Sequence, residues 1–158
     1  MASSAQNELM TRIGPGAPAG NVLRSYWQPV ALSDEMGGSR PVRPVTVFGE
    51  KLVLFRNVDN VLGLISRACG HRGADLCYGR LEDGGLRCPF HGWLFDVSGQ
   101  CIEQPAEPEG STLHQRVRQT SYPVVEKNGV IFSYLGNSKP PCLPNLDCLM
   151  APTSHSFA

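Results

Sequence analysis

The residues most able to carry chemistry are two pairs of cysteine and histidine in the stretch CGHRGADLCYGRLEDGGLRCPFH, residues 69–91. Cys69 and His71 form the first pair, Cys88 and His91 form the second, and sixteen residues separate His71 from Cys88. Thiolate sulfur and imidazole nitrogen are common metal ligands in proteins. The four side chains therefore predict a metal centre with two sulfur and two nitrogen ligands.

The spacing within each pair distinguishes two kinds of metal centre. Structural zinc sites also use two cysteines and two histidines, usually with two to four residues between the members of a pair. Cys88 and His91 fit that spacing, whereas Cys69 and His71 have one residue between them. A centre with two irons removes the difficulty, because each pair can send its cysteine to one iron and its histidine to the other. Those are the ligands of a Rieske [2Fe–2S] cluster, and a structural zinc module is the alternative.

The longer stretch CGHRGADLCYGRLEDGGLRCPFHGWLFDVSGQCIEQPAEP, residues 69–108, resembles the Rieske domain of aromatic-ring-hydroxylating oxygenases. The similarity is to the alpha components of the phthalate-dioxygenase-like and phenoxybenzoate-dioxygenase-like kinds. It extends upstream to YWQPVALSDE (26–35) and downstream to YPVVEKNGVIFSYLG (122–136).

The resemblance implies a role for each residue of the two pairs. Cys69 and Cys88 are expected to hold an inner ferric iron, and His71 and His91 an outer, redox-active iron. The supporting residues expected to shape the two loops are Arg72, Gly73, Gly92 and Trp93. Glycines let the backbone approach the cluster closely, so that backbone N–H groups can donate to its sulfurs.

The resemblance also predicts where the reduction potential lies. High-potential Rieske proteins carry an additional disulfide across the two loops, and its positions are occupied here by Ala74 and Phe90. No serine or tyrosine hydroxyl follows His91 directly, so the cluster sulfurs have fewer hydrogen-bond donors. Fewer donors stabilise the reduced state less. We therefore expect a potential near the low end of the Rieske range.

Short β-branched or aromatic runs broken by turn residues dominate the rest of the sequence. They predict an all-β, Rieske-type iron–sulfur domain of small antiparallel sheets, with a two-loop subdomain that binds the cluster. No helical period is long enough to predict more than a helical turn near residues 21–26. The predicted turns are Gly49-Glu50, Asp59-Asn60, Asp83-Gly84-Gly85, Ser98-Gly99 and Asn128-Gly129.

The domain organisation follows from composition. Residues 1–21 are expected to be a flexible N-terminal arm, residues 22–137 the Rieske domain, and residues 138–158 a Pro-rich tail that connects to an absent catalytic domain. The arm lacks the apolar segment of a secretory signal, so the expected location is the cytoplasm, where thiols stay reduced. Lysine and arginine together number 14, as do aspartate and glutamate together, so the charge does not suggest nucleic acid as a partner. No apolar run approaches the roughly 20 residues that span a bilayer, so no membrane partner is expected.

The remaining cysteines and histidines are not predicted to bind metal. Cys77 and Cys101 are expected to be buried apolar residues, and Cys142 and Cys148 to be exposed in the tail. Oxygenases of the family also need a mononuclear Fe(II), bound by two histidines and a carboxylate in a second domain. The sequence contains no motif of the type D-x2-H-x4-H that supplies those histidines. This chain alone is therefore not expected to hydroxylate an aromatic compound.

The leading functional hypothesis is one-electron transfer. A flavin or ferredoxin reductase would donate electrons, and the mononuclear iron of an oxygenase catalytic domain would accept them. The resemblance implies a parent protein that is a dioxygenase or monooxygenase and a homotrimer. A free-standing Rieske ferredoxin and a structural zinc-binding module are the alternatives.

Overall fold

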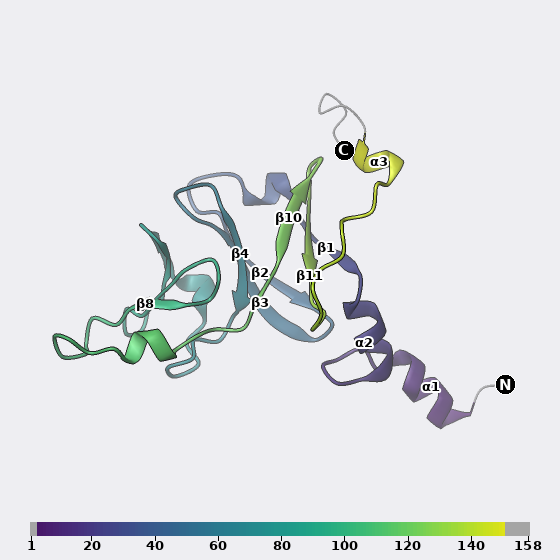
Figure 1. Ribbon diagram of the computed structural model, residues 1–158, viewed down its shortest axis with the longest axis horizontal. Coiled ribbons are helices and arrows are strands. Elements are labelled where there is room, and N and C mark those ends of the chain that lie inside the picture. The colour runs from purple at the N-terminus through teal and green to yellow at the C-terminus, as the bar shows by residue number, and fades with distance from the viewer. Residues whose placement is uncertain (1–2, 151–158) are drawn as a thin grey trace.

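Three small antiparallel sheets make up most of the molecule, as the sequence predicts (Figure 1). The computed structural model describes residues 3–150. The first sheet has the order β1-β11-β10, the second β2-β3-β4-β9 and the third β5-β6-β7-β8. The strands are β1 (Trp27–Leu32), β2 (Val42–Val47), β3 (Glu50–Arg56), β4 (Leu62–Ser66), β5 (Arg80–Glu82), β6 (Gly85–Arg87), β7 (Leu94–Phe95), β8 (Cys101–Glu103), β9 (Ser121–Tyr122), β10 (Val124–Lys127) and β11 (Val130–Tyr134).

The hairpins form at the turn residues that the sequence marks. β10 and β11 meet at Asn128 and Gly129, both with positive φ, which is the backbone that a two-residue hairpin turn needs. The turn between β2 and β3 lies one residue earlier than predicted, at Phe48 and Gly49. Glu50 is already paired with Val47 and therefore belongs to the strand.

The second sheet contributes to two hydrophobic cores, because successive side chains of a strand point to opposite faces. Along β3, Val53 and Phe55 belong to one core, while Leu52 and Leu54 belong to the other. The first core also contains residues of the third sheet, and the second contains Ile131 of the first sheet. The second sheet is thus packed on both faces, which explains the continuous apolar run of β3.

Helices occur where the sequence predicts at most one helical turn. α1 (Ser4–Thr11) begins with a capping box, in which Ser3 and Gln6 exchange side-chain-to-backbone hydrogen bonds. α2 (Pro18–Arg24) begins with proline at its first position, where a missing N–H costs nothing. The shorter helices are η1 (Ser33–Met36), η2 (Leu76–Tyr78), η3 (Leu113–Arg116) and α3 (Asp147–Met150). No helix in residues 3–150 has the length and apolar character needed to cross a bilayer.

The tail after residue 137 contacts the domain more closely than the sequence suggests. The indole Nε1–H of Trp27, on β1, donates to the carbonyl of Pro141 at 2.8 Å. Leu149 of α3 is buried, with 4% of its surface exposed. Cys142 is exposed, as predicted, whereas the side chain of Cys148 and residues 151–158 lie outside the described parts.

The core around Phe55 predicts a large loss of stability on truncation. Replacing Phe55 by Ala is expected to lower the free energy of unfolding by about 3–5 kcal/mol, because the ring is fully buried between sheets and its removal leaves a cavity. Urea denaturation measures the change. Val58→Ala is the control, since Val58 is 60% exposed, and it should shift the midpoint little. Equal stability of Phe55→Ala and wild type would contradict this packing.

Candidate metal centre

The two predicted pairs lie on two loops at the end of the molecule that contains β8, opposite α1 (Figure 1). The first ligand loop, residues 69–74, follows β4 and precedes η2. The second ligand loop, residues 88–93, joins β6 to β7. The structure therefore brings the two cysteines together and the two histidines together, although each pair comes from two separate segments.

The first ligand loop is closed by two backbone hydrogen bonds. The N–H of Cys69 donates to the carbonyl of Ala74, and the N–H of Gly73 donates to the carbonyl of Cys69, both at 2.8 Å. Gly73 has φ +70°, in the left-handed region that other residues adopt with difficulty. This glycine lets the chain reverse within a few residues, so that Cys69 points inward while His71 stays at the surface.

The second ligand loop repeats that pattern. The N–H of Cys88 donates to the carbonyl of Trp93 at 2.8 Å, and the N–H of Gly92 donates to the carbonyl of Cys88 at 3.2 Å. Gly92 has φ +74° and stands four residues after its cysteine, as Gly73 does in the first loop. Both glycines therefore occupy the position at which the chain reverses in its loop.

The two thiols are buried and adjacent. Cys69 and Cys88 are each 3% exposed, and both are free thiols. Burial raises the pKa of Cys69 to about 11, and the neighbouring Cys88 thiol adds to the rise. The backbone N–H groups of His71 and Arg72 hydrogen-bond the Cys69 sulfur and oppose that shift. A positively charged metal placed here would favour the thiolates and would be bound with release of protons.

The two imidazoles are more exposed to solvent than the two thiols. His71 is exposed and His91 is half-buried. Their ring centroids are 4.5 Å apart, in an edge-to-face arrangement. Partial desolvation and the nearby His91 and Arg72 lower the pKa of His71, which favours the neutral imidazole that binds metals. Arg72 is exposed beside His71.

Trp93 is the supporting residue with the most direct contact. Its indole is 8% exposed and stacks on the ring of His71, with centroids 4.5 Å apart and planes 8° from parallel. Because Trp93 belongs to the second loop and His71 to the first, the stack joins the two loops.

An arginine beside each loop holds its ends together, which the sequence analysis missed. Arg67 donates through Nε to both carboxylate oxygens of Asp75 at 2.9 Å, across the mouth of the first loop. Asp75 also accepts the N–H of Cys77 at 2.9 Å. Arg87 forms ion pairs with two glutamates and donates to the carbonyl of Gly92 in the second loop. Charged pairs scattered along the chain gave no signal that they would meet at the loops.

Gln119 is a second residue that the sequence analysis missed. It is 6% exposed, and its Nε2 donates to the carbonyl of Ala68 at 2.9 Å, directly before the first loop. Its backbone N–H donates to the carbonyl of Gly99, in the turn between β7 and β8, at 2.7 Å. Gln119 therefore connects the segment that enters one loop to the hairpin that leaves the other.

The spare cysteines lie where the sequence predicts. Cys77 and Cys101 are both buried in the core that also contains Cys69 and Cys88. Burial raises the pKa of Cys77 to about 11 and also raises that of Cys101. Both thiols therefore remain protonated at neutral pH and behave as small apolar side chains.

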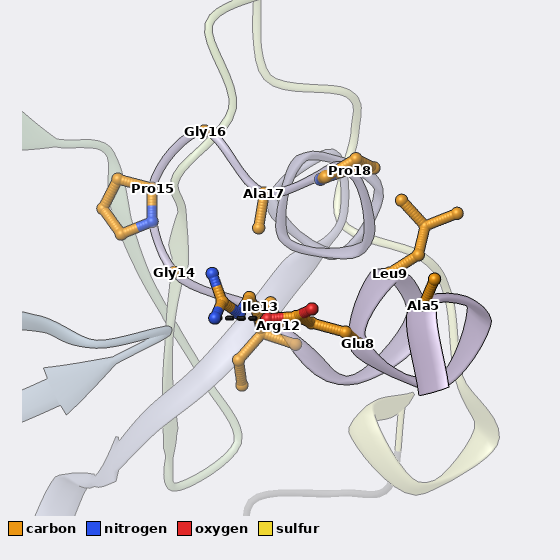
Figure 2. A pocket seen from close by; sticks show the side chains of 10 residues that line it. All are labelled: Ala5, Glu8, Leu9, Arg12, Ile13, Gly14, Pro15, Gly16, Ala17 and Pro18. Carbon is orange, nitrogen blue, oxygen red and sulfur yellow. Dashed lines mark ion pairs between the residues drawn. The ribbon is translucent and has the colours of Figure 1, made fainter. Parts of the chain in front are cut away.

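A hollow of about 770 Å³ lies elsewhere, between α1 and the start of α2 (Figure 2). Glu8 and Arg12 form an ion pair at its edge. Its lining contains no cysteine or histidine; the residues are Ala5, Glu8, Leu9, Arg12, Ile13, Gly14, Pro15, Gly16, Ala17 and Pro18. It is at the other end of the molecule from the ligand loops (Figure 1).

Comparison with known proteins decides the family. Residues 26–126, more than half of the chain, match the family model of the Rieske [2Fe-2S] domain. This chain belongs to the Rieske [2Fe–2S] domain family.

Relatives of this Rieske domain are oxygenase subunits. Phenoxybenzoate dioxygenase subunit alpha of Ectopseudomonas oleovorans is 47% identical over 141 residues, which are 89% of this chain and 34% of the relative. The phthalate 4,5-dioxygenase oxygenase subunit of Pseudomonas putida is 40% identical over 138 residues, 86% of this chain and 31% of the relative. The chain thus spans about a third of the length of these relatives.

Solved structures agree with this fold. Dicamba monooxygenase is 32% identical and superposes with a TM-score of 0.72, over 84% of this chain and 42% of that chain. The oxygenase in the reduced oxygenase–ferredoxin complex of carbazole 1,9a-dioxygenase is 29% identical, with a TM-score of 0.66 over 76% of this chain and 31% of that chain. The all-β Rieske fold predicted from the sequence is confirmed.

The ion pair across the first loop predicts a pH-dependent contribution to the stability of the Rieske domain. The Arg67 guanidinium lowers the pKa of Asp75 to about 2 from an ordinary value of 3.8. Because the folded pKa is depressed, the stabilisation is complete above about pH 4 and is lost as the pH falls toward 2. Asp75→Asn is expected to cost about 1.5–3 kcal/mol at neutral pH, and the difference from wild type should shrink below about pH 4. Urea denaturation across this pH range measures both.

Asp83→Asn provides the matched control, because Asp83 is exposed in the turn between β5 and β6. It should leave the denaturation midpoint nearly unchanged at every pH. An Asp75→Asn variant that is as stable as wild type at neutral pH would show that the Arg67 pair does not hold the loop.

Proposed function

We propose that Cys69, His71, Cys88 and His91 hold a [2Fe–2S] cluster and that the chain transfers single electrons. The observation that carries the proposal is the arrangement of the donors, with one pair of buried, adjacent thiols and one pair of adjacent imidazoles that are more exposed. The chain belongs to a family whose cofactor has this ligand set. Each loop contributes one sulfur and one nitrogen.

The arrangement favours two metal ions over one. A single zinc ion needs its ligands gathered around one point in a tetrahedron. Within residues 3–150, no three side chains of His, Cys, Asp or Glu lie close enough to hold one ion. The thiols instead form one close pair and the imidazoles another. This separation supports the cluster over the zinc alternative.

In the proposed function the protein stabilises the negative charge of the thiolate ligands and leaves the histidine side of the site accessible to a partner. When bound, a Rieske cluster supplies a one-electron couple between two states that differ by one unit of charge. The backbone N–H groups of His71 and Arg72 stabilise negative charge on the sulfur of Cys69. The burial of Cys69 and Cys88 excludes water from the inner side. The surface position of His71 and His91 lets a partner come close to the metals from the outer side.

The relatives support a place for this activity in an oxygenase. In this proposal a flavin or ferredoxin reductase donates electrons on the histidine side. The mononuclear Fe(II) of an oxygenase catalytic domain accepts these electrons and uses them to hydroxylate an aromatic compound. The parent protein in this proposal is a homotrimer. The similarity to oxygenase subunits about three times the length of this chain favours that role over a free-standing ferredoxin.

Removing one imidazole tests the ligand assignment. The protein is purified anaerobically after loading with iron and sulfide. Wild type is expected to contain equal amounts of iron and acid-labile sulfide, to be red-brown and to give a rhombic EPR signal when reduced. His91→Ala should lose this signal, because one iron loses half of its protein ligands. Cys77→Ala is the matched control, since Cys77 is a buried cysteine of the same core, and it should keep the signal.

A zinc site would give a different outcome. Wild-type protein that is colourless and contains zinc without labile sulfide would overturn the proposal. Retention of the full spectrum by His91→Ala would reject His91 as a ligand.

The reduction potential is expected in the lower part of the range of about −150 to +300 mV that Rieske centres cover. The side chains of Ala74 and Phe90 offer no hydrogen bond to the cluster sulfurs and cannot form a disulfide between the loops. Gly92 and Trp93 supply no hydroxyl after His91, so the reduced state gains less stabilisation. A spectroelectrochemical titration measures the midpoint, and a value in the upper half of the range would contradict the prediction.

A further inference from the structure

The stack between His71 and Trp93 is a contact between the two ligand loops rather than within one. The rings are 4.5 Å apart between centroids and 8° from parallel, so the imidazole stacks on the indole with the two rings offset. The backbone closures described above each stay within one loop. The cysteines of these loops are free thiols and form no covalent link between them.

The two partners of the stack differ in how firmly they are held. Trp93 is 8% exposed, belongs to the core that contains Phe55 and Phe95, and has its carbonyl bound by the N–H of Cys88. His71 is exposed and belongs to neither hydrophobic core of the described residues. An exposed side chain exchanges rotamers freely, unless a fixed neighbour covers one face. The buried indole is therefore the fixed partner of the stack, and it restricts the orientation of the imidazole.

We propose that Trp93 is a positioning residue, which sets the plane of the His71 ring and holds the first loop against the second before any metal is bound. The proposal rests on the role of His71 as a ligand given above. With one face covered, the imidazole keeps a fixed plane and presents the same edge to the interior. The ligand set is then largely preorganised, so the entropy cost of ordering His71 is met during folding rather than at metal binding.

His91 is held differently, which makes the two imidazoles inequivalent. Its ring touches Phe90, with centroids 4.3 Å apart and planes at 45°. Phe90 is 65% exposed and belongs to neither hydrophobic core of the described residues. His71 is therefore backed by a buried ring, whereas His91 is backed by an exposed one. Phe90 provides a matched control for Trp93, because it is also an aromatic residue of the second loop in contact with one of the histidines.

The stack also has an electrostatic consequence. The face of an aromatic ring carries negative charge density, which attracts positive charge lying above it. The imidazole of His71 carries more positive charge when the iron it binds is oxidised. The indole therefore stabilises the oxidised state relative to the reduced state, and removing it should raise the midpoint potential. Phenylalanine retains an aromatic face and should restore most of the wild-type value, whereas leucine should not.

The first experiment uses the protein without cluster, so that it does not depend on metal binding. NMR spectra of the folded wild type should show the His71 ring protons shifted upfield by the indole, with the signals assigned from their loss in His71→Gln. The shift should vanish in Trp93→Leu, fall in Trp93→Phe because benzene has the weaker ring current, and persist in Phe90→Leu. Wild-type His71 signals at the positions of an exposed histidine would overturn the proposal without any variant.

The second experiment uses the cluster-loaded protein. Trp93→Leu should have a higher midpoint potential than wild type, and Trp93→Phe should lie close to wild type. Equal potentials in wild type and Trp93→Leu, each with its cluster intact, would reject the electrostatic role of the indole. If leucine prevents folding, Trp93→Phe carries the test through its reduced NMR shift, and an unchanged shift would reject the stack. Failure of the proposed function would give a different result from failure of the Trp93 proposal, because the wild-type protein itself would then bind no cluster.

Discussion

The structure depends on placing two thiols inside the protein and two imidazoles at its surface, only two or three residues further along the chain. Burial makes an ionised thiol costly, and it raises the pKa of Cys69 to about 11. Backbone N–H groups from His71 and Arg72 offset part of this cost, which requires the chain to curl around the sulfur. The curl in turn requires a residue with positive φ, and glycine occupies that position in both loops, at Gly73 and Gly92. The first loop is thus shaped by what its cysteine needs, and the second loop has the same closing hydrogen bonds.

The second sheet, β2-β3-β4-β9, fixes the position of the two ligand loops through the core that they share. β3 presents Phe55 to the core that contains both ligand cysteines, and it presents Leu54 to the core shared with the first sheet. The thiols are therefore packed against the same layer on which the rest of the domain is built. Gln119 strengthens this link, because it reaches from the segment before β9 to the entrance of the first loop. The site is a part of the folded core, not an appendage to it.

The turns and the candidate ligands were predicted from the sequence, whereas the first helix and the ion pairs between side chains were not. The turn at Asn128 and Gly129 is encoded by those two residues, because both adopt positive φ readily. The four candidate ligands can also be identified from their residue types and their spacing in two short segments. The pairing of Arg67 with Asp75 could not be predicted, because either charge is equally plausible on a solvated surface. The helix α1 was missed because none of its residues is buried, so its capping box at Ser3 was the main signal.

The unequal spacing of the two pairs explains why the histidines do not occupy equivalent places. Both loops are closed by the same hydrogen bonds, counted from the cysteine, yet histidine is the third residue of the first loop and the fourth of the second. Two facing loops with histidines at identical positions would bring the rings together symmetrically. With the offset of one residue, the ring of His71 instead stacks on Trp93. The ring of His91 meets the ring of His71 edge to face. It also places Phe90 before one histidine and Arg72 after the other, so the outer rim combines an exposed aromatic ring with a positive charge. A symmetric pair of C-x-x-H loops, which suits a single tetrahedral zinc ion, would not give this arrangement.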